Sequence, residues 1–247
     1  MWELWMVMTA FIIVAAAGFI QGLVGFGSGL IMIPTLVLII EPSVLVPVSL
    51  LQGLIMNWAL TLESRKSLQL KRVVPILLGG IIGIPFGTAL LLLLAPEHLK
   101  IMIGTVVVLF GILLLLGLTM RMKREKTASF PIGIASGILN GSISLSGPPV
   151  ILFFSNQGVL KDNFRSNLVA YFFFLNVITT AVFLFTGLIT WKVIMLTAIL
   201  LPAALIGVFI GSRASKLVPQ KVFRRIALLI VIGAGMLSLV TGLVGVT

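Results

Sequence analysis

Long apolar runs separated by short polar loops dominate this chain of 247 residues. Many of the runs reach 18 or more residues, and a helix of that length crosses about 30 Å of hydrocarbon. The pattern therefore predicts an all-α polytopic membrane protein with eight to ten membrane segments. The predicted segments are residues 4–24, 29–40, 44–62, 72–94, 99–120, 129–139, 148–156, 164–187, 190–211 and 222–244.

Positive charge is concentrated in four of the loops. The loops at 63–72, 121–126, 157–165 and 212–225 contain 15 of the 17 Lys and Arg residues. Loops rich in Lys and Arg stay in the cytoplasm. This assignment orients the long helices consistently and places residues 97–100 outside.

The shorter segments are predicted to form hairpins. Helix 44–62 ends at the cytoplasmic loop 63–72, so it starts outside. Residues 4–40 must therefore enter the membrane from outside and return. Residues 129–156 must do the same from the cytoplasm. A helix rises about 1.5 Å per residue, so pieces of about ten residues cannot span. The second pair is thus predicted to be a re-entrant hairpin. For the first pair, a re-entrant hairpin and a slanted full crossing both stay open, since 4–24 is long enough to span.

The two halves are predicted to be inverted repeats, residues 1–120 and 129–247, joined by a basic cytoplasmic linker at 121–128. Each half is a hairpin followed by three long helices, and the first begins outside whereas the second begins inside. Paired Gly- and Pro-interrupted segments of this kind indicate a transporter with its site at the repeat interface. Elsewhere, Gly-x-x-x-Gly spacing is typical of close helix packing. We expect such packing at Gly83 with Gly87 and at Gly207 with Gly211.

The hairpin tips carry the candidate chemistry. Ser28 is expected to cap a helix that starts at residue 29, and Ser146 is expected to cap one with proline in its first turn. Helix N-termini present free N–H groups and partial positive charge, so two of them form an anion site that needs no basic side chain. All 17 Lys and Arg and all 6 Asp and Glu residues fall in loops or at segment ends, which fits an uncharged site.

Candidate contacts to the anion come from the tips and from neighbouring helices. For the amides of Asn57 and Asn176, bonding to a neighbouring helix is an equally open interpretation. Arg165 is expected to attract the anion from the cytoplasm or to act only as a topology charge. The tip candidates are Gly25, Phe26, Gly27, Ser28, Gly29, Asn140, Gly141, Ser142, Ser144, Ser146, Gly147 and Pro148. The neighbouring candidates are Gln21, Gln52, Asn57, Tyr171, Asn176 and Arg165.

Several other functions do not fit the sequence. The net charge of +11 is spread over loops rather than gathered in a basic domain, so no nucleic-acid partner is predicted. The chain has no cysteine and one histidine, and it lacks the buried nucleophile, base or metal ligands that an enzyme needs. We therefore predict no catalysis, no metal and no cofactor. The expected partners are a small anionic substrate and the lipid bilayer, and small-residue helix faces are compatible with a homodimer.

The glycine-rich runs resemble a known family. The run 22–29 followed by Pro34, and Gly137, Gly141 and the run 146–149 in the second half, are similar to the TauE/SafE family of sulfite exporters. The resemblance covers essentially the whole chain. It implies export of sulfite, sulfoacetate or a related organosulfonate across the plasma membrane, and we expect alternating access as the mechanism. An anion channel, an uptake permease for another oxyanion and a non-transporting assembly factor remain as alternatives. The anion, the direction of flux and the coupling ion stay open.

Overall fold

The computed structural model describes residues 4–116, 125–155, 161–215, 232–233 and 235–245. In these ranges the chain is helical and contains no strand, which confirms the predicted fold class. Of the predicted segment 222–244, residues 222–231 and 234 lie outside the described residues, and residues 232–233 and 235–244 are helical. The elements are α1 (Leu4–Val24), α2 (Ser28–Leu36), α3 (Pro42–Ser64), the 3₁₀ turn η1 (Arg65–Ser67), α4 (Leu70–Leu93), α5 (Pro96–Leu115), α6 (Glu125–Ile143), α7 (Gly147–Ser155), α8 (Lys161–Phe185) and α9 (Trp191–Ala214).

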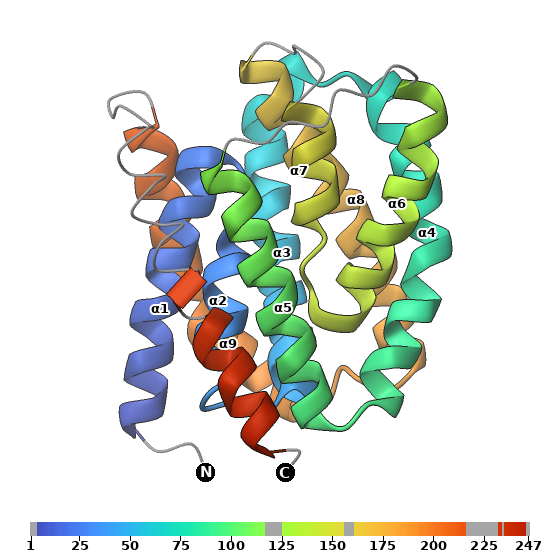
Figure 1. Cartoon of the computed structure of the whole chain (residues 1–247). Coiled ribbons are helices and arrows are strands. Elements are labelled where there is room, and N and C mark those ends of the chain that lie inside the picture. The colour runs from blue at the N-terminus through green and yellow to red at the C-terminus, as the bar shows by residue number, and fades with distance from the viewer. Residues whose placement is uncertain (1–3, 117–124, 156–160, 216–231, 234, 246–247) are drawn as a thin grey trace.

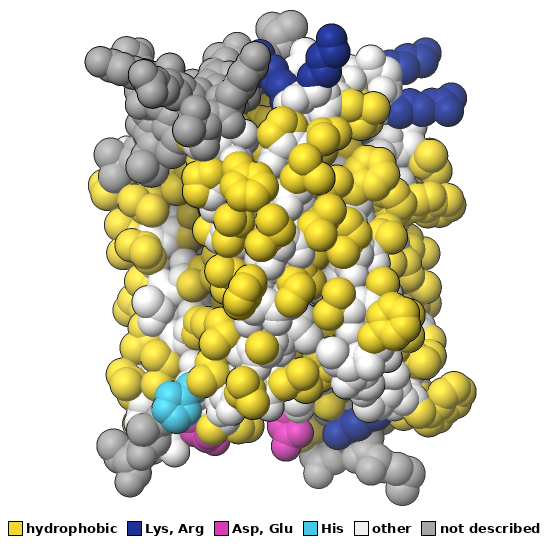
Figure 2. Space-filling view, turned by 90° about the vertical axis from the view of Figure 1, so that its right-hand side faces the viewer, with side chains coloured by type: hydrophobic (Ala, Val, Ile, Leu, Met, Phe, Trp, Pro, Cys, Tyr) yellow, Lys and Arg dark blue, Asp and Glu magenta, His cyan; other side chains and the backbone are white. Residues whose placement is uncertain are grey.

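Many large hydrophobic side chains are exposed on the outside of the bundle. Figure 2 shows hydrophobic side chains over the middle of the molecule, most of the visible Lys and Arg at one end, and acidic side chains at the other. Among the described residues, six helices are long and apolar enough to cross a membrane. The protein is thus a multi-pass membrane protein, as predicted. The six spans are Leu4–Val24, Pro42–Ser67, Leu70–Leu93, Pro96–Leu113, Asp162–Phe185 and Trp191–Ala214.

Two helical hairpins pair a long first leg with a short second one. Figure 1 shows α6 entering the bundle, the chain turning inside it, and α7 returning to the same side, which is the predicted re-entrant course. In the first hairpin, α1 has 21 residues and α2 has nine. The second hairpin has a first leg of 19 residues in α6. The predicted segment 129–139 was therefore too short. The polar residues after it remain helical because their side chains find partners inside the protein, as when Ser142 Oγ donates to the carbonyl oxygen of Ile138.

The hairpins and the long helices pack crosswise. Helix α6 runs along α4, α1 runs along α9, and α3 packs against α8. At the α4–α6 contact a Cβ on Gly137 would lie 2.1 Å from the Gly80 carbonyl oxygen, and at α1–α9 a Cβ on Gly211 would lie 2.0 Å from that of Phe19. The backbones are thus in direct contact, which small residues allow. Gly83, Gly87 and Gly207 sit equally close to backbone atoms of the partner helix, and the predicted packing role is confirmed.

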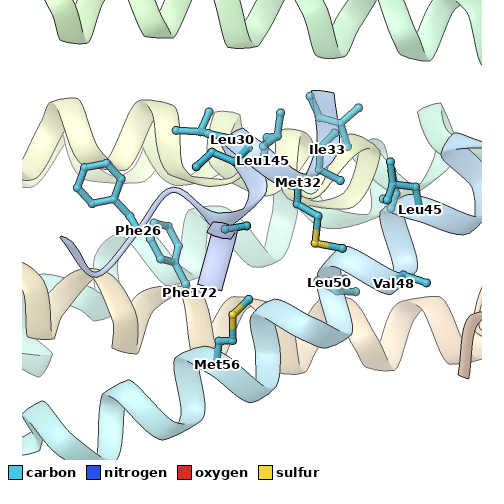
Figure 3. Packing of buried hydrophobic residues seen from close by; sticks show 14 of the residues in the cluster. Phe26, Leu30, Met32, Ile33, Leu45, Val48, Leu50, Met56, Leu145 and Phe172 are labelled. Atoms are coloured by element: carbon cyan, nitrogen blue, oxygen red, sulfur yellow. The ribbon is translucent and has the colours of Figure 1, made fainter. Parts of the chain in front are cut away.

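The hairpin tips are enclosed by protein. Figure 3 shows Phe26, Phe172, Leu30 and Leu145 around the start of α2, and all four are buried. Non-helical backbone at membrane depth is tolerated only where protein or a polar cavity surrounds it. This packing satisfies that condition and brings the two tips together, since a Cβ on Gly29 would lie 3.1 Å from the carbonyl oxygen of Ser144.

Candidate functional site

A small cavity lies where the two hairpin tips meet α3 and α8. Its volume of about 50 Å³ has room for a few water molecules or one small oxyanion. None of the residues that line it is charged. The lining comprises Gln21, Phe26, Gly27, Ser28, Gly29, Leu30, Ser49, Gly53, Asn57, Asn140, Ser144, Leu145, Ser146, Gly147, Pro148, Ile151, Phe172 and Asn176.

The first tip turns on two glycines and is held by a glutamine. Gly25 and Gly27 have φ of 89° and 104°, a left-handed conformation that glycine adopts without strain. Gly27 is the N-cap of α2, so the prediction that Ser28 caps this helix is wrong. Instead, the Ser28 N–H and hydroxyl donate to Gln21 Oε1 at 3.1 and 2.8 Å. The N–H groups of Gly29 and Leu30 follow in the first turn, where helix geometry supplies no acceptor.

The second tip is held by a chain of hydroxyl groups. Tyr171 donates to Ser136 Oγ at 2.8 Å, and Ser136 donates to the Ser146 carbonyl oxygen at 2.7 Å. Ser146 precedes the first residue of α7, but proline at the second and third helical positions, 148 and 149, has no N–H for a capping hydroxyl to accept from. Within the described residues the Ser146 hydroxyl has no hydrogen-bond partner. Of the first three residues of α7, only Gly147 contributes an N–H, fewer than the sequence interpretation assumed.

Two asparagines face the cavity from α3 and α8. Gln21 Nε2 donates to Asn57 Oδ1 at 2.6 Å, and Asn140 Nδ2 donates to Asn176 Oδ1 at 3.2 Å. The partners in each pair are 36 residues apart. The Nδ2 atoms of Asn176 and Asn57 lie 3.1 and 3.9 Å from the position that a Cβ on Gly53 would occupy. Neither Nδ2 has a partner among the described residues, so two amide N–H₂ groups border one open space.

Some predicted contacts lie outside this lining. Gln52 Nε2 donates to the Thr197 carbonyl oxygen at 2.9 Å, and Ser142 bonds within its own helix. Gly141 packs on the backbone of α4, and Gly25 packs on the aliphatic part of Arg165. Tyr171 acts through Ser136, as described above. The cavity thus brings together twelve of the eighteen predicted residues, and direct anion contact by any of them stays a prediction.

Arg165 holds the first hairpin from the side. Its Nη2 donates to the Gly22 carbonyl oxygen at 2.8 Å, and its Nη1 lies 3.8 Å from Glu63 Oε1. Glu63 Oε2 also accepts from the Ser212 hydroxyl at 2.6 Å. This residue therefore links α8 to α1 and, through Glu63, to α3. An attraction of anions by Arg165 stays a prediction.

Sequence reasoning missed six lining residues. Ser49, Gly53 and Asn57 are four residues apart on α3, and Phe172 and Asn176 have the same spacing on α8. Positions four apart share a helix face. The small and polar residues at this spacing from Asn57, Ser49 and Gly53, were therefore a usable signal. The missed residues are Leu30, Ser49, Gly53, Leu145, Ile151 and Phe172.

The fold and the cavity together define a polytopic membrane protein with an uncharged cavity between its two hairpin tips. A family model described as "Sulfite exporter TauE/SafE" matches residues 10–238. The chain belongs to this family, whose members are membrane transporters rather than enzymes, and the match confirms the resemblance seen in the sequence. No curated protein and no solved structure matches the chain.

Proposed function

We propose that this protein is a secondary transporter that exports sulfite, sulfoacetate or a related organosulfonate across the plasma membrane by alternating access. The family supports a sulfur-anion exporter. The observation that carries the finer proposal is the cavity of about 50 Å³ between the two tips, whose unpartnered polar groups are mostly donors and which no charged residue lines. The anion would sit there, between the amides of Asn57 and Asn176 and the start of each short helix.

The physical chemistry of this site suits transport. An anion leaving water must replace its hydration shell, and N–H and O–H donors in a dry site do this well. Because no basic side chain lines the cavity, the anion would not be trapped by a fixed opposite charge. Passage requires binding that is favourable enough for entry and weak enough for release. Export also follows an inside-negative potential, which supplies about 2.3 kcal/mol per charge per 100 mV.

The crosswise packing supports a route to alternating access. We propose that the halves are inverted repeats, because the Gln21–Asn57 and Asn140–Asn176 bonds occupy matching places, each linking the long hairpin leg to the next long helix. The direct backbone contacts join α1 to α9 and α6 to α4. These pairs would move as rigid units about α3 and α8, opening the cavity first to one side and then to the other.

The test is sulfite flux through the purified protein in liposomes. We expect saturable efflux that is accelerated when unlabelled sulfite is added on the opposite side, because a carrier must return its site across the membrane. Empty liposomes give the background rate. Flux that does not saturate and shows no acceleration would instead identify an anion channel. No flux of sulfite or of any organosulfonate would contradict the proposed substrate class, and flux of a different oxyanion alone would indicate another permease.

A further inference from the structure

We propose that Gln21 and Asn140 are positioning residues that fix the amide orientation of Asn57 and Asn176, so that each presents its N–H₂ group to the cavity. The inference rests on the proposed function, because it explains how an uncharged cavity selects an anion. An amide side chain has a donor end and an acceptor end of nearly the same shape. An asparagine therefore favours an anion in one orientation and opposes it in the other.

In the first half, a backbone group determines the orientation. The Ser28 N–H donates to Gln21, so the atom that it meets must be Oε1. The N–H₂ end of Gln21 is then directed to Asn57. The Asn57 side chain must therefore accept this hydrogen bond with its Oδ1, at 2.6 Å. The Nδ2 of Asn57 is what remains for the cavity. A rotated Asn57 would set two N–H₂ groups against each other and lose this bond.

In the second half, a different backbone group has the same effect. The Thr179 hydroxyl donates its single proton to the Leu175 carbonyl oxygen at 2.9 Å, so it can only accept from Asn140. Asn140 must therefore present Nδ2, which donates to Thr179 Oγ1 at 2.8 Å and to Asn176 Oδ1 at 3.2 Å. The Nδ2 of Asn176 is again the end left for the cavity.

The surroundings keep this arrangement in place. Gln21, Asn57, Asn140 and Asn176 are between 1% and 5% exposed, so little water is present to compensate a rotated amide. The Oδ1 of Asn140 has no partner among the described residues, so the four side chains leave two donor groups and one acceptor unpaired. Two backbone groups, the Ser28 N–H and the Leu175 carbonyl oxygen, thus determine which end of the Asn57 and Asn176 amides faces the cavity.

A double-mutant cycle in liposomes tests the inference. The variants are Gln21→Met, Asn57→Ala and their combination, with the KM for sulfite, the maximal rate and the melting temperature measured for each. If Gln21 acts through Asn57, each single change raises KM about tenfold with a smaller effect on the maximal rate. The combination is then no worse than Asn57→Ala alone, since the positioned group is already gone. Gln21→Met combined with Asn176→Ala is the matched control, and there the two effects should multiply.

The second half provides an independent cycle if Gln21→Met does not fold. Asn140→Leu and Asn176→Ala should behave in the same non-multiplying way. Multiplying effects within either pair, or an unchanged KM in Gln21→Met and Asn140→Leu, would overturn the positioning role while leaving the proposed function standing. Absence of saturable sulfite flux in the unmodified protein would overturn the proposed function and this inference together.

Discussion

Replacing both Asn57 and Asn176 with alanine is expected to raise the KM for sulfite about a hundredfold. Each side chain would lose one hydrogen bond to a charged ligand, and such bonds contribute about 1.5–3 kcal/mol. Because 1.4 kcal/mol corresponds to a factor of ten, two independent losses multiply to this size or more. The bonds that the asparagines accept from Gln21 and Asn140 are interhelical bonds in a membrane protein, which average about 0.6 kcal/mol. The variant should therefore still fold.

Gln52→Ala is the matched control for this pair. Gln52 is a fully buried amide on α3, the helix that carries Asn57, but it bonds Thr197 rather than lining the cavity. The KM for sulfite should change little, and the melting temperature should fall about as much as in the double variant. Equal losses of flux in Gln52→Ala and in the asparagine variant would show that buried amides matter only for packing.

Gly137→Ala is expected to have the largest effect on folding. The added Cβ would lie 2.1 Å from the Gly80 carbonyl oxygen and 2.8 Å from the carbon of that group. These are backbone atoms of α4, which cannot rotate away as a side chain does, so the two helices must separate. Overpacking of this kind costs typically about 1–3 kcal/mol and occasionally more. We expect a much lower yield of monodisperse protein in detergent and a clearly lower melting temperature.

Gly233→Ala is the corresponding control. Gly233 is also helical, and outside its own helix a Cβ there would meet no heavy atom of the described residues within 4 Å. Alanine at a compatible site is neutral or stabilising by about 0.4–1 kcal/mol. If Gly137→Ala melted at the same temperature as Gly233→Ala, the backbone contact between α4 and α6 would not be present as described.

The sequence predicted the elements of this fold better than their contacts. Apolar length and the distribution of Lys and Arg identified the helices and the re-entrant course of the second hairpin, because burial in lipid leaves few other solutions. Helix α6 was predicted too short because Asn140 and Ser142 were taken as part of the turn. Their polar groups form hydrogen bonds inside the protein instead. For Asn140 the hydrogen-bond partner depends on where the helices cross.

The candidate site was predicted only in part, because some of its features are local to the sequence and others depend on how the helices pack. The tips were recognised from glycine and proline, whose backbone properties are local, and both asparagines were named as candidate contacts from neighbouring helices. The partner of each amide was not predictable, since Gln21 and Asn57 meet only once α1 and α3 are packed. The number of N–H donors at α7 was overestimated, although Pro148 and Pro149 are visible in the sequence and a proline has no N–H to offer.

The most direct test of the cavity as the anion site is sulfite flux in Gly53→Ala. The single methyl group would lie 3.1 Å from Asn176 Nδ2 and 3.9 Å from Asn57 Nδ2, in the space that the anion is proposed to occupy. It touches no backbone atom of another helix within that range, so the melting temperature should match that of the unmodified protein. If the cavity is the anion site, sulfite flux at low substrate concentration falls at least about tenfold. Unchanged flux in the folded variant would contradict this assignment.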